Sequence, residues 1–380
     1  MDALTPTTVP TVPLNSVPAL PPAARADWLR QMPLEPWLEV GDPLAEAVVR
    51  TLRARHLPLS QPLAAMRRLA AEGEPTCAAL LHDMETPPAW ADFEAMGRGG
   101  AMGYRHFLQL SIALIHGGLM TTFSTADAAR ILSGTNRLEQ NVVRRLFESA
   151  TLFFGVLDTE ALRPGGSAWE ICLRVRLMHA MVRLRLVDGG NWDGVGGQPI
   201  NAMHTAAGPL FFGAMVLERL QKLGGSFSAA EGEGYYLLWR YVTRLLGVPD
   251  GLLGDTRAEQ EILDARILPY AFNPDANSRR LAEALLSGLR HLPNAERVPR
   301  VVHEVLAREM LGEAQADCMG IALHPRGARL ARGIMRGFKL YGWMLRLPGV
   351  SRLSAAFGRR FMDRLVERGL AGVAADFQPH

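Results

Sequence analysis

The chain has little cysteine and little imbalance of charge. Its 380 residues include only Cys77, Cys172 and Cys318, and no CxxC or Cys/His cluster occurs. Three widely spaced cysteines support neither a disulfide framework nor a zinc site, so a reducing compartment is the simpler interpretation. The formal net charge is +3 and aromatic residues make up 7% of the chain. This composition carries no signature of nucleic-acid binding, and we predict no nucleic-acid partner.

Targeting signals and long apolar runs are also missing. The opening stretch MDALTPTTVPTVPLNSVPALPP has no basic n-region, no long apolar core and no twin-arginine signal. The longest apolar candidate, FLQLSIALIHGGLM, is shorter than the roughly 18 residues that cross a bilayer. We therefore expect a cytoplasmic protein, with peripheral membrane contact left open. The repeated prolines predict an extended, partly mobile leader over residues 1–40.

A period of 3.6 residues dominates from Asp42 onward, and no alternating strand pattern of useful length is present. DPLAEAVVRTLRARH predicts an amphipathic helix capped by Asp42, while Ser124 and Ser228 are expected caps of later helices. HFLQLSIALIHGG predicts a very apolar helix that ends at its glycine pair. The sequence thus predicts an all-α fold, with one large domain of roughly a dozen or more helices over residues 41–325.

The C-terminal part, residues 326–380, differs in charge. Its stretch from Arg326 to Val366 contains ten Arg or Lys residues and one acidic residue, Asp363. The apolar residues recur at helical spacing, which predicts basic amphipathic helices. Two interpretations remain open: a packed helix pair with a solvated basic face, or peripheral contact of 326–366 with an anionic membrane.

Several familiar catalytic motifs are absent. GRGGAMG at 97–103 lacks the GxGxxG spacing and has no following GKS or GKT, so we interpret it as a hinge or close-packing turn. His303 and Glu304 do not form an HExxH motif, and there is no GxSxG elbow. A P-loop, a zinc protease and an α/β-hydrolase are therefore not supported.

One histidine, His179 in RVRLMHAMVR, lies on a mostly apolar helix face edged by arginines. Residues three, four and seven positions away share that face: Cys172, Val175, Arg176, Val182 and Arg183. An apolar slot with one imidazole can hold a porphyrin, whose propionates arginines can bind. A satisfied core histidine has the same pattern, so spacing alone leaves both interpretations open.

The preceding helix carries further polar candidates. Arg145 and Ser149 share a face, with Glu148 beside them. An antiparallel pair joined by residues 158–167 would set Arg145 and Ser149 across a cavity from His179.

Five segments in order carry a resemblance to a known family. They are GDPLAEAVV (41–49), TNRLEQNVVRRLFESATLFFGVLD (135–158), LRPGGSAWEICLRVRLMHAMVR (162–183), GGQPINAMHTAAGPLFFG (196–213) and YYLLWRYVTRLLGVPDGLL (235–253). Together they resemble the latex-clearing proteins and MpaB-type oxygenases. The resemblance implies an all-helical fold enclosing one haem b, with His179 as the proximal iron ligand. It also places the family's distal arginine and hydroxyl on Arg145 and Ser149.

The chain departs from the rubber-cleaving members at three positions. Glu148 stands where those members have a lysine, and Ala129 falls near the position of their glutamate base. Asp127 is the closest carboxylate, but two residues along a helix turn it away from that position. His204 replaces the acidic residue after the PIN motif. These departures keep the haem interpretation and weaken the polyisoprene one.

Three functional hypotheses follow. The leading one is a haem b-dependent oxygenase that uses O2 to cleave or oxidise a C=C bond of an apolar, isoprenoid-like small molecule. Its expected catalytic residues are Arg145, Ser149 and Glu148, and its expected cofactor-binding residues are His179, Arg145, Arg176 and Arg183, with His179 on the iron. The alternatives are a haem sensor or carrier without turnover, and a metal-free helical interaction protein at a membrane surface. The oligomeric state is left open.

Overall fold

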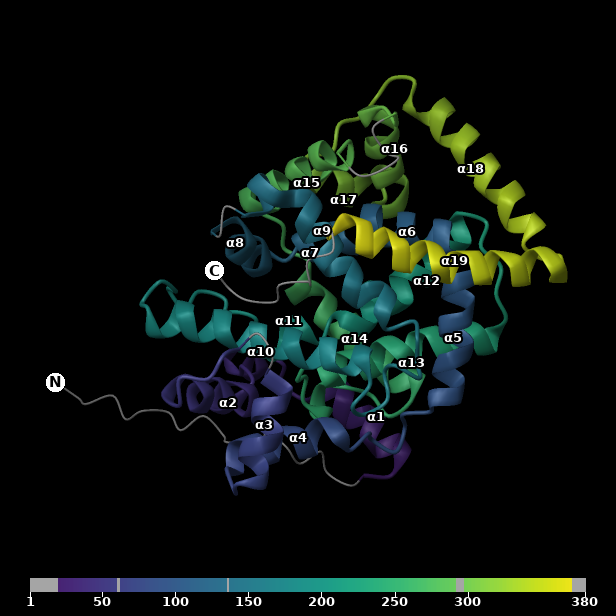
Figure 1. The fold of residues 1–380 in the computed structure, drawn as a ribbon. Helices are drawn as coiled ribbons and strands as arrows, with labels where there is room; N and C mark the ends of the chain where they lie inside the picture. Colours follow the sequence, from purple (N-terminus) through teal and green to yellow (C-terminus); the bar gives the residue numbers. More distant parts are fainter. Residues whose placement is uncertain (1–19, 60–61, 135–136, 292–296, 371–380) are drawn as a thin grey trace.

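The computed structural model describes residues 20–59, 62–134, 137–291 and 297–370. In these ranges the chain is all-α, as predicted, with more than a dozen helices and no strand (Figure 1). The first half contains α1 (Pro22–Gln31), η1 (Glu35–Glu39), α2 (Pro43–Ala54), α3 (Pro62–Ala71), α4 (Pro75–Glu85), α5 (Phe93–Arg105), α6 (Phe107–Ala113), the π-helical η2 (Leu114–Leu119), α7 (Met120–Phe123), α8 (Ala126–Gly134), α9 (Arg137–Gly155) and α10 (Ser167–Asp188).

The second half continues the helical series. It contains α11 (Ala202–Thr205), the π-helical η3 (Pro209–Ala214), α12 (Met215–Lys222), α13 (Ala229–Leu245), η4 (Asp250–Leu252), α14 (Arg257–Ala271), α15 (Ala276–Leu289), α16 (Arg300–Leu311), α17 (Glu313–Cys318), α18 (Gly327–Met344) and α19 (Pro348–Gly369). Helix α13 begins at the predicted cap, because the Ser228 side chain accepts from the Glu231 N–H in a capping box. Asp42 caps α2 in the same way, through the N–H of Ala45.

Helices α5 and α13 cross at very close range in the centre of the molecule. A Cβ added to Gly99 would lie 2.1 Å from the backbone nitrogen of Tyr235, and one added to Gly234 would lie 2.0 Å from the Ala95 carbonyl oxygen. Only glycine permits this approach. The GRGGAMG stretch is therefore a helical packing surface, so the predicted close packing is confirmed and the predicted turn is wrong.

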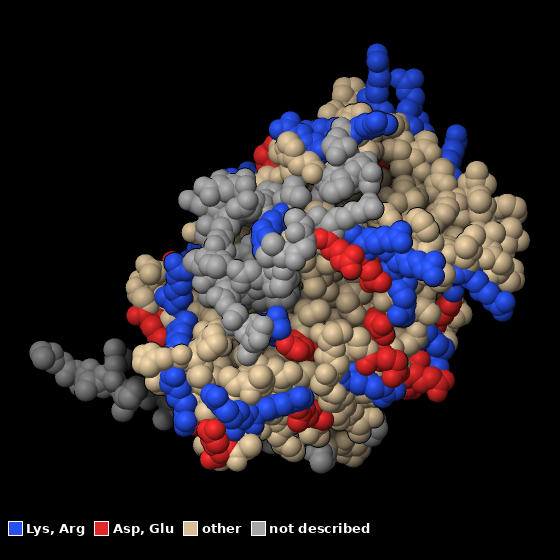
Figure 2. Space-filling view, in the orientation of Figure 1, with Lys and Arg blue, Asp and Glu red and all other residues tan. Residues whose placement is uncertain are grey.

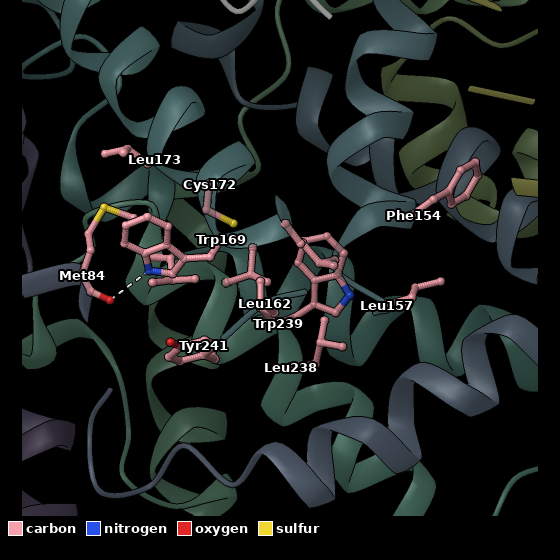
Figure 3. Packing of buried hydrophobic residues seen from close by; sticks show 14 of the residues in the cluster. Met84, Phe154, Leu157, Leu162, Trp169, Cys172, Leu173, Leu238, Trp239 and Tyr241 are labelled. Atoms are coloured by element: carbon pink, nitrogen blue, oxygen red, sulfur yellow. Dashed lines mark hydrogen bonds between the residues drawn. The ribbon is translucent and has the colours of Figure 1, made fainter. Parts of the chain in front are cut away.

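The core beside this crossing is rich in aromatic side chains. Trp169 of α10 donates from Nε1 to the Met84 carbonyl oxygen at 3.0 Å, across the α4–α10 contact (Figure 3). Trp239 of α13 packs with Phe153 and Phe212, at ring-centroid distances of 5.6 and 5.0 Å. These contacts hold α10 against α4, and α13 against α9 and η3. Helix α10 and the segment after α13 both contribute to the site described below.

Two local predictions are wrong because distant residues intervene. The apolar helix does not end at its glycine pair but continues through it as the π-helical η2, where Arg219 Cδ would lie 2.5 Å from a Cβ on Gly117. The first N–H of α8, that of Ala126, is accepted by the Asn273 side chain at 2.9 Å, while the Ser124 hydroxyl donates to a preceding carbonyl. Neither partner is adjacent in sequence.

Part of the predicted leader is packed. Residues from Pro22 form α1 and η1, and Leu29 and Leu34 are buried. Helix α1 packs on α14, and Arg25 forms an ion pair with Glu259 at 3.0 Å. Apolar residues at helical spacing explain this order despite the neighbouring prolines. The remainder of the predicted leader, residues 1–19, lies outside the described residues.

The basic C-terminal segment forms two helices, α18 and α19, that meet at a corner of the molecule (Figure 1). Helix α19 packs on α5, α6 and α9, while α18 contacts α16. No single described helix is long and apolar enough to cross a membrane. One pair, Phe107–Phe123 with Ala126–Gly134, meets the length and composition requirements together but is bent by 94°.

Candidate functional site

His179 lies on α10 and faces a small cavity of about 10 Å³, roughly the space of one water molecule. The lining residues are Gly41, Asp42, His179, Arg183, Ile200, Ala202, Thr205, Leu246, Gly247 and Val248. The imidazole makes no hydrogen bond or ion pair with any described residue. Burial, followed by the nearby Arg183 charge, lowers the pKa of His179 to about 4. The ring is therefore neutral at pH 7, which is the form that binds a metal.

A buried ion-pair cluster supports one wall of this cavity. Arg176, one turn before His179, donates to the two Asp42 carboxylate oxygens at 2.6 and 3.1 Å and to Asp83 at 2.6 Å. Arg244 of α13 completes the cluster with a 2.6 Å bond to Asp83. Burial alone would lower the pKa of Arg176, but the two carboxylates raise it above its usual value. The cluster ties α2, α4 and α13 to α10 beside the imidazole.

Gly247 closes the cavity after α13 and is forced to be glycine. Its backbone has φ of +93°, in the region that favours glycine. A Cβ there would lie 2.2 Å from an Asp42 carboxylate oxygen and 2.7 Å from the Arg176 Nε. The LLGV sequence that ends α13 is thus fitted to the ion-pair cluster.

Arg183 holds the loop that carries the PIN motif. It donates from Nε to the Pro199 carbonyl oxygen at 3.0 Å and from Nη2 to the Ile200 carbonyl oxygen at 2.5 Å, and it pairs with Glu46 at 2.8 Å. Ile200 has φ of +52°, a costly backbone conformation for a β-branched residue. The Ala202 N–H donates to the Val40 carbonyl at 2.8 Å and fixes the other end. The loop is therefore held rigidly against the His179 cavity.

Of the other expected site residues, Arg183 lines this cavity, whereas Arg176, Glu148 and Ser149 are not among its lining residues. Arg176 and Arg183 have protein partners, so their predicted contact with a cofactor stays a prediction. Glu148 is buried and accepts from the Arg144 Nε at 3.0 Å, and Ser149 is half-buried. None of the described cavity-lining residues comes from α9. The side chain of Arg145 lies outside the described residues.

His204, which replaces the family's acidic residue after PIN, lies near Asp127, the carboxylate closest in sequence to the position of the family's base. The His204 Nδ1 is 3.8 Å from an Asp127 carboxylate oxygen. Burial raises the pKa of Asp127 and lowers that of His204 to about 4. His204 also adjoins Thr205, a lining residue of the cavity. The two groups do not share a hydrogen bond, because the His204 Nδ1 has the Asn201 Nδ2 as its partner at 3.2 Å and Asp127 contacts Arg130 at 3.5 Å.

Sequence reasoning missed several walls of the cavity. Gly41, Thr205 and Leu246 lie within three of the segments that carry the resemblance, but no local pattern assigned any of them to the cavity. The PIN and LLGV segments were identified only as parts of a resemblance. The tertiary structure shows that both segments line the cavity beside His179.

The family model for the ER-bound oxygenase mpaB/B'/Rubber oxygenase catalytic domain matches residues 104–346. The chain belongs to this family. The rubber oxygenase of Streptomyces sp. (strain K30) is 24% identical over 249 residues, which are 64% of this chain and 60% of that relative. The chain thus spans about 60% of the length of that relative.

The fold of this oxygenase-family chain also matches a solved structure. Latex clearing protein in its closed state superposes with a TM-score of 0.64 at 19% identity, over 87% of this chain and 90% of that one. The match confirms the all-helical fold of the family. At 19% identity the comparison concerns the fold alone. The resemblance inferred from the five segments is therefore confirmed.

The chemistry of the cavity fits a haem iron better than a multidentate metal site. The described residues contain no cluster of three or more His, Cys, Asp or Glu side chains that would hold a metal ion. A single neutral imidazole with no hydrogen-bond partner among the described residues could hold the iron of a macrocycle, which would supply the other ligands itself. The cavity of about 10 Å³ is far smaller than the ~300–1,000 Å³ of most cofactor pockets. This conformation therefore has no room for a porphyrin, and binding one requires the surrounding segments to move apart.

Proposed function

We propose that this chain is a haem b-dependent oxygenase that cleaves or oxidises a C=C bond of an apolar, isoprenoid-like small molecule. The observation that supports the proposal is the neutral, partner-free His179 on the wall of a cavity, in a chain of this oxygenase family. The curated relative is a rubber oxygenase, whose name indicates an apolar polymeric substrate. We infer a smaller isoprenoid-like substrate for this chain.

His179 would hold the haem iron through one ring nitrogen. When bound, haem would supply a redox-active iron at which dioxygen is activated. Oxidative cleavage balances without an external reductant, since an alkene and O2 give two carbonyl groups. The apolar lining residues Leu246 and Val248 would exclude water. Arg145 and Ser149 are the proposed polar groups on the opposite side, where each would donate a hydrogen bond.

The spectrum of the purified protein tests the cofactor. Protein made in haem-sufficient cells is expected to show a Soret band that shifts on reduction with dithionite. His179→Ala should lose the band, and added imidazole should restore part of it. His82→Ala is the matched control, because His82 is an exposed histidine on α4 and should leave the band unchanged. Absence of the band in the unmodified protein contradicts the proposal.

A second candidate is a haem sensor or carrier without turnover. Ala129 is fully buried near the position of the family's base, and the Glu148 carboxylate is bound to Arg144. Both observations favour reduced proton-transfer capacity on the distal side. Oxygen consumption with a panel of terpenoid alkenes separates the two candidates. A stable oxygen-bound spectrum with no consumption across the panel supports the carrier.

The Glu148→Gln variant tests whether Glu148 acts as a base during turnover. If Glu148 acts as a base, the variant should keep its Soret band and lose most of its oxygen consumption, with about 10²–10⁴-fold lower turnover. Ser149→Ala should also keep the band. Unchanged turnover in Glu148→Gln removes Glu148 from the proposed catalytic residues while leaving His179 in place.

A further inference from the structure

The outer side of the α18–α19 corner is apolar although it faces solvent. Trp343 is 59% exposed and Leu353 is 72% exposed. The exposed large apolar residues of this corner are Leu340, Trp343, Met344, Leu347, Leu353 and Phe357. Contiguous exposed patches of this kind mark interaction sites in soluble proteins.

The same two helices carry basic side chains without partners. Seven on the helices, with Arg326 just before α18 and Arg346 in the turn between the helices, form no ion pair with any described residue. The seven are Arg329, Arg332, Arg336, Lys339, Arg352, Arg360 and Arg364. On α10, by contrast, Arg174, Arg176 and Arg183 each pair with a carboxylate. The only acidic residues in the described part of α18 and α19 are Asp363 and Glu367, both near the end of α19. The positive charge of this surface is therefore not neutralised within the described chain.

The basic and apolar residues are ordered along the helices. On α18, Arg332, Arg336 and Leu340 follow one stripe at four-residue spacing, which continues to Trp343. On α19 the order is reversed, with Leu353 and Phe357 before Arg360. Both apolar ends meet at the corner, where Arg346 and Arg352 lie next to Leu347 and Leu353 in the sequence. Figure 2 shows this corner as an uncharged surface with Lys and Arg side chains at its margins.

The inner side of the corner is anchored to the rest of the protein. Gly358 lies against the Tyr104 carbonyl, where a Cβ would be 2.2 Å from its oxygen, and Ser354 donates to the Arg105 carbonyl at 2.8 Å. Phe361 packs on Phe107 at 5.2 Å between centroids. These contacts hold α19 in place, so the outer surface is preformed and needs no ordering when it binds.

We propose that the α18–α19 corner docks on an anionic phospholipid membrane. The apolar residues at the corner enter the interfacial layer, while the flanking arginines contact lipid phosphates. Along α18, Arg336 lies seven residues before Trp343, about 10 Å at the helical rise, so the guanidinium stays at headgroup level when the indole inserts. This surface does not depend on haem.

Other partners fit the surface less well. A second copy of the chain would bring two sets of unpaired cations together and increase their repulsion. A nucleic acid would satisfy the cations but leave the apolar corner in water. An anionic membrane is complementary to both the charge and the apolar area.

Vesicle co-sedimentation of the full chain tests the charge. Binding is expected to vesicles of phosphatidylcholine with phosphatidylglycerol, to weaken with added salt, and to be far weaker without the anionic lipid. Combined Arg332→Gln, Arg336→Gln and Lys339→Gln should lower the partition coefficient roughly 100-fold. The matched control, Arg53→Gln with Arg280→Gln and Arg290→Gln, removes the same charge from exposed positions elsewhere and should have little effect. Equal loss in both variants, or equal binding to neutral vesicles, overturns the proposal.

Brominated lipids test insertion. Trp343 is the one exposed tryptophan of seven, so its emission should be quenched by bilayer-embedded bromine, and Trp343→Phe should remove that quenching. Leu353→Ser with Phe357→Ser should reduce binding, while Val187→Ser with Val195→Ser should not. Unquenched emission overturns the proposal, as does binding to RNA without binding to vesicles, or a dimer that Leu353→Ser dissociates. These vesicle experiments do not depend on haem, so they test the membrane proposal even if the protein shows no Soret band.

Discussion

Arg183 on α10 hydrogen-bonds the carbonyl oxygen of Ile200 at 2.5 Å, and Ile200 is one of two described non-glycine residues with positive φ. The guanidinium thus stabilises a backbone conformation that isoleucine alone disfavours. Because His179 lies one turn before Arg183, the same helix that presents the imidazole also holds the opposite loop of the cavity.

Replacing Arg183 should therefore destabilise the protein and loosen the cavity. Arg183→Met leaves Glu46 and two carbonyl groups without their donor, and we expect it to lower the free energy of unfolding by about 2–4 kcal/mol. Denaturant unfolding measures the change. Arg174→Met is the control on the same helix, since its partly exposed pair with Glu170 is worth under about 1 kcal/mol. Equal losses in the two variants would contradict a special role for Arg183.

Gly247 should tolerate no side chain. Gly247→Ala adds a Cβ against Asp42 and Arg176 as well as backbone strain, so we expect a loss well above the ~1–2 kcal/mol of strain alone. Gly73→Ala is the matched control: its φ of +92° is nearly the same, but nothing lies within 4 Å of the added atom. The difference in melting temperature between the two variants isolates the contact with the ion-pair cluster. A difference of zero would show that the contact is unimportant.

Two glycine-to-alanine substitutions should change the stability in opposite directions, and the first of them tests the close crossing of α5 and α13. Gly99→Ala should destabilise by several kcal/mol, because the added atom meets the backbone of the facing helix, which has no room to relax. Gly333→Ala on α18 meets nothing within 4 Å and should stabilise by about 1 kcal/mol through helix propensity. Calorimetry of both variants checks the pair. Stabilisation by Gly99→Ala would contradict the crossing.

Acid should destabilise the fold partly through His116. Its Nε2 lies 3.1 Å from the Nδ1 of His303, and burial, followed by that neighbour, lowers the pKa of His116 to about 3. A native pKa below the unfolded value means that the unfolded chain binds more protons below about pH 6.5. The stabilising effect is therefore complete above that pH and is lost as the pH falls towards 3.

His116→Gln should remove this part of the pH dependence. Between pH 6.5 and 4.5 the unmodified chain should lose about 2 kcal/mol more stability than the variant, following ~1.4 kcal/mol per pH unit. Denaturant unfolding at several pH values measures both slopes. Parallel curves would show that His116 is not held neutral by the fold.

Local signals in the sequence predicted much of the fold correctly. Asp42 and Ser228 cap their helices, since a cap acts on N–H groups two or three residues away. The predictions at Ser124 and at the glycine pair 117–118 were wrong, because Asn273, between α14 and α15, and Arg219 of α12 contact these segments. A residue more than ninety positions away leaves no trace in a local pattern.

The candidate site was also only partly predictable from the sequence. Helical spacing placed His179 on an apolar face with Arg176 and Arg183, and the order of five segments indicated the family. The partners of those arginines were not predictable, because Asp42, Asp83 and Glu46 lie roughly 90–140 positions earlier in the chain. Spacing suggested free cations for a cofactor, whereas packing supplied each arginine with a carboxylate.

The sequence by itself determined the all-helical architecture, because the 3.6-residue apolar period and the caps act within one helix. It also determined which histidine stands on an apolar face of α10. Only the tertiary structure decided that His179 faces a cavity while its neighbouring arginines are bound elsewhere, and that the cations of the α18–α19 corner remain unpaired among the described residues. The reason is physical: burial and ion pairing depend on which helices meet, and helices that meet are set by packing across the whole chain.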